Sequence, residues 1–275
     1  MAKSPRFQAE EVARALGVAT VEFLGGGAFG DTWRVEDRAV KIICDDKYPA
    51  DRVAREVAGL SRVDSPYVVK LYNARSVLLG GINRPALTFE FVPGGDLDQK
   101  VSSGIRPSNE EASALLRGLL TGLSDLHGAE GTVHRDIKPE NIALRNGSWA
   151  EPVILDLGLA KAMTEETQTV YPAMLGTWLW ASPEQLEHKP GRKQSDVFSV
   201  GVTVRYAITG EHPFIEDWRS ITSLDEVTSA IAAGPKPLPD SVHASLKRVL
   251  DRMVQPIQNE RGSAASNLRL LGDAA

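Results

Sequence analysis

Between residues 20 and 92, apolar and polar positions alternate over short distances, which is the pattern of β-strands. The runs that show it fall at residues 21–26, 31–35, 38–43, 68–74 and 85–92. The second and third runs are joined closely enough, at Glu36 and Asp37, to form a hairpin. Residues 9–16 and 51–63 instead carry apolar residues at helical spacing. This part of the chain therefore predicts a small sheet with one internal helix and one helix before it.

Pro93, Gly94 and Gly95 interrupt this pattern, and the chain beyond them turns mainly helical. Residues 110–127 predict one long amphipathic helix. Residues 195–209 are apolar on nearly every side, which is typical of a helix buried in a large core. We therefore predict an α+β protein with a helical extension at 1–19, a small β-rich lobe at 20–92 and a larger α-helical lobe at 93–275.

Composition narrows the function classes. The 275 residues carry a formal net charge of -5 and no strongly basic run, which disfavours binding to a nucleic-acid backbone. The chain has no run of eighteen apolar residues, so no membrane span is predicted, and its first residues are too charged for a signal peptide. The single cysteine, Cys44, excludes an internal disulfide and suits a reducing compartment. These features predict a soluble cytoplasmic protein.

A glycine cluster after the first strand is the first candidate site. Gly25, Gly27 and Gly30 have the spacing G-x-G-x-x-G, which lets a backbone approach phosphate oxygens closely. Such clusters are more often plain turns, and a dinucleotide-binding turn would need a helix directly after the third glycine. The residues that follow, from Thr32 to Val35, are strand-like. A glycine-rich hairpin covering a nucleotide is the functional reading that remains.

Lys41 lies in the apolar run 39–43, eleven residues after Gly30. A lysine in such a strand is often an edge residue whose ammonium reaches water. A buried ammonium would need an anionic partner, and Glu56 on the predicted helix that follows is the best-placed one. A lysine held by that carboxylate can direct its ammonium at the phosphates of a nucleotide.

The segment 133–141, with the sequence VHRDIKPEN, is the most specific pattern in the chain. It places a carboxylate at Asp136, a cation at Lys138 and an amide at Asn141. Together these groups can accept a hydroxyl proton, neutralise a phosphoryl group and hold a metal ion. Asp156 ends a buried apolar run fifteen residues later, where a carboxylate is costly unless it binds something such as Mg²⁺.

These residues resemble the signature set of eukaryotic-type protein kinases from about residue 21 to residue 261. The resemblance implies a bilobal fold with a helix αC in the small lobe, and transfer of the γ-phosphate of ATP, with Mg²⁺, to Ser or Thr hydroxyls of a protein. The many alanine, valine and arginine residues and the short loops of the sequence suggest a bacterial member of the family. The implied ATP-binding residues are Gly25, Gly27, Gly30, Thr32, Ala39, Lys41, Phe89, Glu90, Val92, Asp96, Asn141 and Asp156.

The resemblance also assigns roles. Asp136 matches the catalytic aspartate and Lys138 the lysine typical of Ser/Thr kinases, while Lys41 and Glu56 match the phosphate-anchoring pair. Asn141 and Asp156 match the metal ligands, with DLG in place of DFG. In the nucleotide pocket, Thr32 replaces a usual Val, Phe89 matches the gatekeeper, residues 90–92 match the hinge, and Asp96 matches the position that often reaches the ribose.

Further positions match structural residues of the family. Ser182-Pro183-Glu184 corresponds to the A-P-E motif, with Arg261 as the expected ion-pair partner of Glu184, and Asp196 is expected to brace the catalytic loop. The resemblance also implies a stacked spine of Leu60, Leu71, His134 and Leu157. Three departures from the family pattern are Trp178 and Trp180, where Pro and Tyr are usual, and Ala143, where a larger residue normally supports the adenine.

Regulation and partners are less determined. Arg135 marks the class in which a phosphorylated activation loop binds that arginine, and the loop offers Thr164, Thr167, Thr169 and Tyr171. Autophosphorylation through transient self-association is therefore expected, although these can be ordinary polar loop residues. A pseudokinase scaffold and a small-molecule phosphotransferase of the same fold are the alternatives. The protein substrate is not specified by the sequence.

Overall fold

The computed structural model describes residues 4–27, 29–45, 50–129, 132–156, 178–218 and 220–272. The chain forms two compact units. The first comprises Met1–Asp64 and Val69–Phe91, and the second comprises Ser65–Val68 and Val92–Ala275. Each unit holds part of the predicted site, so each is described by itself.

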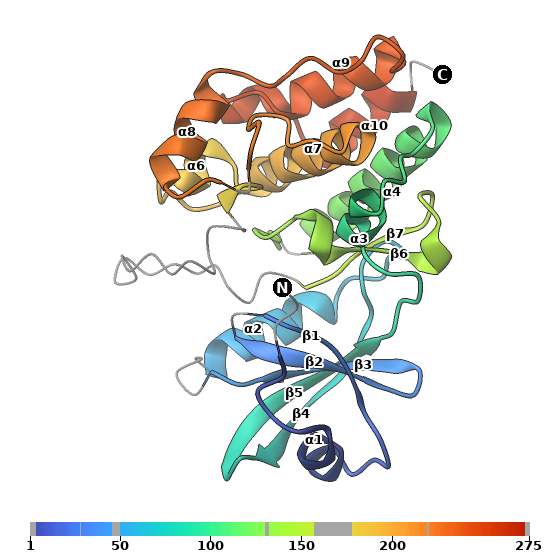
Figure 1. Ribbon diagram of the computed structural model, residues 1–275, viewed down its shortest axis with the longest axis vertical. Coiled ribbons are helices and arrows are strands. Elements are labelled where there is room, and N and C mark those ends of the chain that lie inside the picture. Colours follow the sequence, from blue (N-terminus) through green and yellow to red (C-terminus); the bar gives the residue numbers. More distant parts are fainter. Residues whose placement is uncertain are drawn as a thin grey trace. The chain divides into compact units, whose positions relative to one another are not determined.

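The first unit is a five-stranded antiparallel sheet with two helices (Figure 1). The strand order is β1-β2-β3-β5-β4. The helix predicted at 9–16 is confirmed, and so is the hairpin between the second and third strands. The elements are α1 (Ala9–Leu16), β1 (Glu22–Gly26), β2 (Gly30–Val35), β3 (Arg38–Ile43), α2 (Ala50–Leu60), β4 (Leu71–Leu79) and β5 (Ile82–Glu90).

The last two predicted strands are present, but their bounds are shifted from those that the apolar patterns predicted. The prediction placed them at residues 68–74 and 85–92, whereas β4 and β5 pair along nine residues each. Gly80 and Gly81 both have positive φ, 63° and 77°, and make the turn between them. Because β4 is an edge strand whose middle residues are exposed, its side chains do not alternate between core and solvent, and the pattern is lost.

The core of this unit lies between α1 and one face of the sheet. Val12 and Leu16 of α1 pack with the buried ring of Trp33, and the rest of the cluster comes from three other strands, namely Val40, Ile42, Val77, Leu79 and Ala86. At the end of α1, Gly17 adopts the left-handed conformation and Arg75 donates a hydrogen bond to the Leu16 carbonyl at 2.7 Å. The N-terminal helix is thus part of the hydrophobic core of the sheet.

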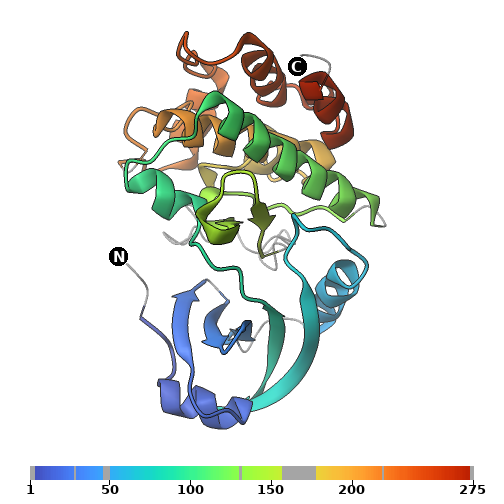
Figure 2. The ribbon, with the colours of Figure 1, turned by 90° about the vertical axis from the view of Figure 1, so that its right-hand side faces the viewer.

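The second unit is mainly helical (Figure 2). The helices predicted at 110–127 and 195–209 are confirmed as α4 and α7, and α4 packs against both α7 and α10. The elements are α3 (Leu97–Ser102), α4 (Asn109–Gly128), η1 (Pro139–Asn141), β6 (Ile142–Leu144), η2 (Arg145–Gly147), β7 (Pro152–Ile154), α6 (Pro183–Leu186), α7 (Lys193–Thr209), α8 (Leu224–Ala232), α9 (Ala244–Met253), η3 (Gln258–Arg261) and α10 (Ala264–Gly272).

Helix α7 is the centre of this unit, because every residue from Ser195 to Ala207 is buried. Such burial explains why the sequence shows no polar face along this helix. In α4, Gly118 and Gly122 allow Tyr67 to pack closely against the helix. A Cβ on Gly122 would lie only 2.8 Å from the Cβ of Tyr67. Among the described residues, no helix combines the length and apolar character required to cross a bilayer.

Candidate active site

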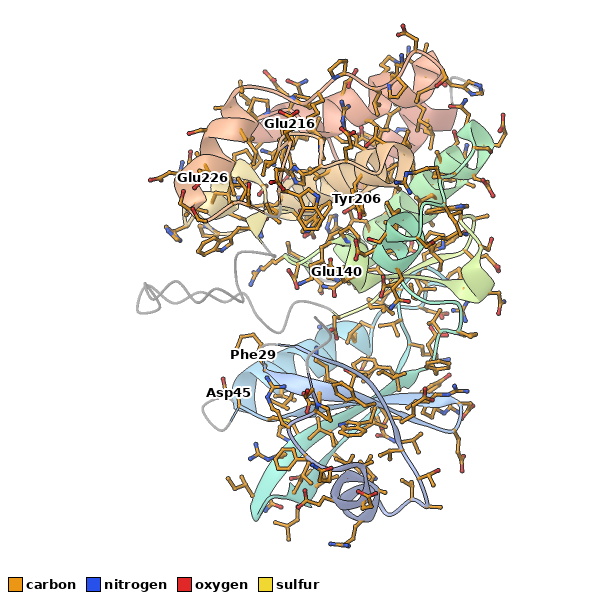
Figure 3. All side chains as sticks on the ribbon, viewed as in Figure 1. Phe29, Asp45, Glu140, Tyr206, Glu216 and Glu226 are labelled. Carbon is orange, nitrogen blue, oxygen red and sulfur yellow. The ribbon has the colours of Figure 1, made fainter. Side chains whose placement is uncertain are left out.

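The glycine-rich loop joins β1 to β2 in the first unit. The Gly27 amide donates to the Gly30 carbonyl at 2.8 Å, and the Phe29 carbonyl accepts hydrogen bonds from the amides of Cys44 and Asp45 at 2.7 and 3.1 Å. Figure 3 shows Phe29 and Asp45 near each other, where β2 begins and β3 ends. A Cβ on Gly30 would lie 2.0 Å from the Ile42 carbonyl oxygen, so only glycine permits this approach of β2 to β3.

The strand register brings the predicted nucleotide-binding residues of this unit onto one face of the sheet. Thr32 lies opposite Lys41, and Ala39 lies opposite Phe89. Directly opposed residues in antiparallel strands share a face, as do residues two apart along one strand. Thr32, Lys41, Ala39 and Phe89 therefore lie on the face opposite the core formed with α1.

Lys41 is buried in β3, with 9% of its surface exposed, so of the two possibilities left open by the sequence the structure favours the buried lysine. Glu56 lies on α2 as predicted, but its side chain is outside the described residues. The ion pair between Lys41 and Glu56 therefore stays a prediction. Glu90 ends β5, where its carboxylate accepts a hydrogen bond from the Lys70 amide at 3.1 Å.

Asp196, in the first turn of α7, anchors the segment 133–141 in the second unit, which by the family resemblance is the catalytic loop. One carboxylate oxygen accepts from the Arg135 amide at 2.7 Å and the other from the His134 amide at 2.8 Å. His127 on α4 makes a further contact with this carboxylate at 2.9 Å. These bonds hold Arg135 at a φ of 69°, a strained conformation that persists only where the surroundings impose it.

His134 joins this loop to the strand that leads to Asp156. Its Nε2 lies 2.8 Å from the Leu155 carbonyl, and its Nδ1 accepts from the Asp136 amide at 3.2 Å. Because Nδ1 accepts and Nε2 donates, the ring is a neutral imidazole with its proton on Nε2. The fully buried ring thus links Asp136 to the end of β7.

Lys138 and Asn141 both contact the carboxylate of Asp136, so the three groups that the sequence singled out lie together. The ammonium of Lys138 lies 3.2 Å from Asp136 Oδ2, and the Asn141 amide nitrogen donates to the same oxygen at 3.1 Å. A second bond, 2.8 Å long, joins that amide nitrogen to the Asp136 carbonyl. The carboxylate is therefore oriented from two sides, with a positive charge next to it.

The segments that carry the two predicted metal ligands are joined by the small sheet of β6 and β7. Asn141 directly precedes β6, Asp156 follows β7, and the Leu155 amide donates to the Asn141 carbonyl at 2.8 Å. With its nitrogen engaged by Asp136, Asn141 has its amide oxygen to offer a cation. A carboxylate and an amide oxygen are ligands that suit Mg²⁺. The residues present therefore fit a magnesium ion.

Two further predicted positions lie beside each other in this unit. Asp96 and Ala143 form an isolated β-bridge, and Asp96 caps α3 by accepting from the Gln99 amide at 2.8 Å. Burial raises the pKa of Asp96, and the hydrogen bond from Gln99 opposes that shift. Val92, two residues before Gly94, is half-buried. Position 94 requires glycine, because its φ is 120° and a Cβ there would collide with the Leu144 carbonyl.

The expected ion pair between Glu184 and Arg261 is confirmed. The fully buried guanidinium of Arg261 donates to both carboxylate oxygens at 2.8 and 2.9 Å. Burial alone would raise the pKa of Glu184, but hydrogen bonds from Arg261 and Ser195 outweigh it and hold the pKa below its ordinary value. Gln185 in the next position donates to the Arg135 carbonyl at 3.0 Å and so connects α6 to the catalytic loop.

Trp178 and Trp180, the departures from the family pattern, are both buried. The Trp180 ring meets Tyr206 and His212 edge to face, each at 5.3 Å between centroids, and Tyr206 is labelled in Figure 3. The Leu179 carbonyl lies 2.9 Å from His212 Nε2, and Ser199 donates to the Trp180 carbonyl at 2.8 Å. Sequence reasoning missed Gln185, Ser199 and His212, because no local spacing marks them.

The pKa of His212 gives a stability test for this segment. Burial lowers that pKa from 6.5 to about 4, although the contact with the Leu179 carbonyl opposes the shift. Between those two pH values the unfolded chain binds a proton that the native state does not. We therefore expect the free energy of unfolding to fall as the pH drops from 6.5 towards 4, by at most about 3 kcal/mol.

Urea unfolding at pH 7, 6 and 5 would measure this effect in the wild-type protein and in His212→Gln, which removes the titrating group. His243→Gln, at an exposed position, is the matched control. The pH dependence of the wild type should exceed that of His212→Gln, and His243→Gln should behave as the wild type. Equal slopes in all three proteins would contradict the assignment.

Comparison with known proteins agrees with this geometry. The protein kinase domain family matches residues 18–270. The probable serine/threonine-protein kinase PkwA of Thermomonospora curvata is 30% identical over 80% of this chain and 29% of its own length. Serine/threonine-protein kinase PknH of Mycobacterium tuberculosis is 26% identical over 84% of this chain and 37% of its own. The chain thus spans roughly a third of the length of these relatives.

Among solved structures, that of Rad53 1-466 in complex with AMP-PNP matches with a TM-score of 0.70 and 27% identity, over 90% of this chain and 62% of that one. The predicted fold class, a small β-rich lobe and a larger helical lobe, is confirmed. The chain belongs to the protein kinase family. The bacterial relatives named above are serine/threonine-protein kinases.

Proposed function

We propose that this domain transfers the γ-phosphate of ATP to Ser or Thr hydroxyls of a protein substrate, in a reaction that requires Mg²⁺. The observation that carries the proposal is the convergence of Lys138 and Asn141 on the Asp136 carboxylate, with the strand leading to Asp156 bonded to Asn141. An active enzyme is favoured over a pseudokinase scaffold, because the chain has all four residues that such scaffolds commonly lose, namely Lys41, Asp136, Asn141 and Asp156.

In the first unit, the glycine-rich loop and Lys41 would hold the phosphates of ATP. Thr32, Ala39 and Phe89, on the same sheet face as Lys41, would line the adenine site together with the backbone of Glu90 and Val92. Glu56 would orient Lys41. We propose an extension at 1–19, an N-lobe at 20–92 and a C-lobe at 93–275, a division that differs from the two compact units at residues 65–68 and at Val92.

In the second unit, Asp136 would accept the proton of the substrate hydroxyl, and Lys138 would stabilise negative charge on the phosphoryl group. Asp156 and Asn141 would hold Mg²⁺, which neutralises phosphate charge when bound. Asp96 would contact the ribose. The transition state of phosphoryl transfer is loose, so the contribution of these residues is mainly positioning and electrostatic.

A small-molecule phosphotransferase of the same fold is the second candidate. The ion pair of Glu184 with Arg261 and the bonds from Asp196 to the catalytic loop favour a protein kinase, since these features support the segment that would bind a peptide. No observation on the described residues names the protein substrate. We also propose a cytoplasmic location, because the single cysteine suits a reducing compartment. A signalling role would follow from the proposed phosphorylation of a protein.

Incubation with labelled ATP, Mg²⁺ and a generic basic protein tests the proposal. We expect labelled phosphoserine or phosphothreonine on the protein, and its loss on addition of EDTA. ATP binding without transfer would indicate a pseudokinase, and transfer only to aminoglycosides or choline would indicate a small-molecule kinase.

The candidate autophosphorylation sites Thr164, Thr167, Thr169 and Tyr171 lie outside the described residues. Mass spectrometry before and after incubation with ATP would locate any modification among them.

A further inference from the structure

The segment that precedes α1 is fixed to the sheet of the first unit by Phe7. The guanidinium of Arg84 lies over the Phe7 ring at 5.3 Å from its centroid, and this ring also packs against the buried cluster beneath α1. It lies so close to Gly80 that a Cβ there would be 2.8 Å from the ring. This anchoring determines where the preceding residue, Arg6, can reach.

Arg6 contacts two points of the glycine-rich loop and the strand after it. Its amide donates to Asp31 Oδ2 at 2.7 Å, and its guanidinium forms an ion pair with Asp31 Oδ1. The same guanidinium donates from Nη2 to the Gly27 carbonyl at 2.8 Å. Asp31 is fully buried, whereas the side chain of Arg6 is 37% exposed. A buried carboxylate needs such a partner, so Asp31 fixes the place of the guanidinium.

These contacts are at both ends of the turn of the loop. Gly27 starts the turn, its amide already donates to the Gly30 carbonyl, and Asp31 directly follows Gly30. The Phe29 carbonyl, within the turn, accepts hydrogen bonds from the amides of Cys44 and Asp45, which follow β3. Figure 3 labels Phe29 and Asp45. The residues after β3 thus hold the loop at Phe29, and the hydrogen bond from Arg6 holds it at Gly27.

We propose that Arg6 is a positioning residue for nucleotide binding, through which the segment ahead of the kinase sheet holds the glycine-rich loop in place. The inference rests on the proposed function, because it assumes that this loop covers the phosphates of ATP. A loop that is already ordered loses less conformational entropy when the nucleotide binds. A charge-assisted hydrogen bond to a loop carbonyl supplies that order without a contact to ATP.

The first experiment compares the wild type with Arg6→Ala and with Arg14→Ala. Arg14 is a matched control, because it is an exposed arginine of the same N-terminal segment on α1. We expect Arg6→Ala to raise the Kd for Mg-ATP and the KM for ATP about five- to tenfold, with kcat changed less than about twofold. Amide hydrogen exchange at residues 25–31 should become faster in Arg6→Ala only.

Since Arg6→Ala leaves a buried carboxylate without its ion pair, this variant can fail to fold. The double variant Arg6→Gln with Asp31→Asn removes both charges and shortens the side chain that reaches Gly27. We expect it to melt cooperatively and to bind Mg-ATP as weakly as Arg6→Ala. Wild-type affinity in a folded Arg6 variant would overturn the inference, whereas failure of the wild type itself to bind Mg-ATP would overturn the proposed function.

Discussion

Replacement of Asp156 by Asn is expected to lower the rate of phosphoryl transfer at least about 100-fold, which corresponds to about 2.7 kcal/mol of barrier. The reason is the loss of a carboxylate that we propose holds Mg²⁺ next to Asn141. The change should leave the fold intact, because Asp156 has a φ of 44° and Asn tolerates this left-handed conformation well. Lys41→Met should cause a loss of similar size, because it removes the ammonium that we propose contacts the phosphates. It should also leave the fold intact, because methionine keeps the apolar stem of the buried lysine.

Single-turnover assays at saturating Mg-ATP would measure the effect, with thermal melting of each variant as the check on folding. Asp125→Asn, at an exposed position on α4, makes the same chemical change away from the site and should keep wild-type activity. Near-normal transfer by purified Asp156→Asn would disprove its assignment as a metal ligand.

Replacement of Arg261 by Met is expected to lower the free energy of unfolding by about 3–5 kcal/mol. This guanidinium is fully buried, and besides Glu184 it donates to the carbonyls of Gln255 and Pro256 at 2.7 and 2.9 Å. Methionine fills part of the space but satisfies none of these acceptors, and it leaves the Glu184 carboxylate buried beside Ser195 without its cation.

A double-mutant cycle isolates the part of this loss that belongs to the ion pair. Glu184→Gln combined with Arg261→Met should be less destabilised than the sum of the two single variants, because no buried charge is left unpaired. Arg269→Met, at an exposed position on α10, is the control and should change stability by less than about 0.5 kcal/mol in urea unfolding. Additive effects would show that the two side chains do not act together.

Local patterns predicted several elements closely and failed for others. The helices α1, α4 and α7 and the strands β2 and β3 lie within two residues of their predicted bounds, because each buries one side, or all sides, over its whole length. The strand β4 was displaced because it is an exposed edge strand. The short helix α6 was not predicted, because four residues are too few to show a helical period, and its residues were noted only for their motif.

The candidate site divides in the same way. Asp136, Lys138 and Asn141 are close in sequence, so their spacing predicted that the three groups act together, and in the structure Lys138 and Asn141 both contact the Asp136 carboxylate. The bonds of Asp196 to His134 and of Arg261 to Glu184 join residues 62 and 77 positions apart. These two contacts were predicted only through the family resemblance. His212, Ser199 and Arg6 have no such motif, and nothing in the sequence indicated their contacts.

By itself, the sequence determined which chemical groups are available and in which short segments, since spacing within a loop or helix fixes what neighbours can do. The tertiary structure decided which face of the sheet carries Thr32, Ala39, Lys41 and Phe89, because a strand's facing depends on register with partners far along the chain. It also decided that Arg6 bonds to Gly27. Burial of Asp31 and the packing of Phe7 bring these distant residues together, and no local pattern encodes that packing.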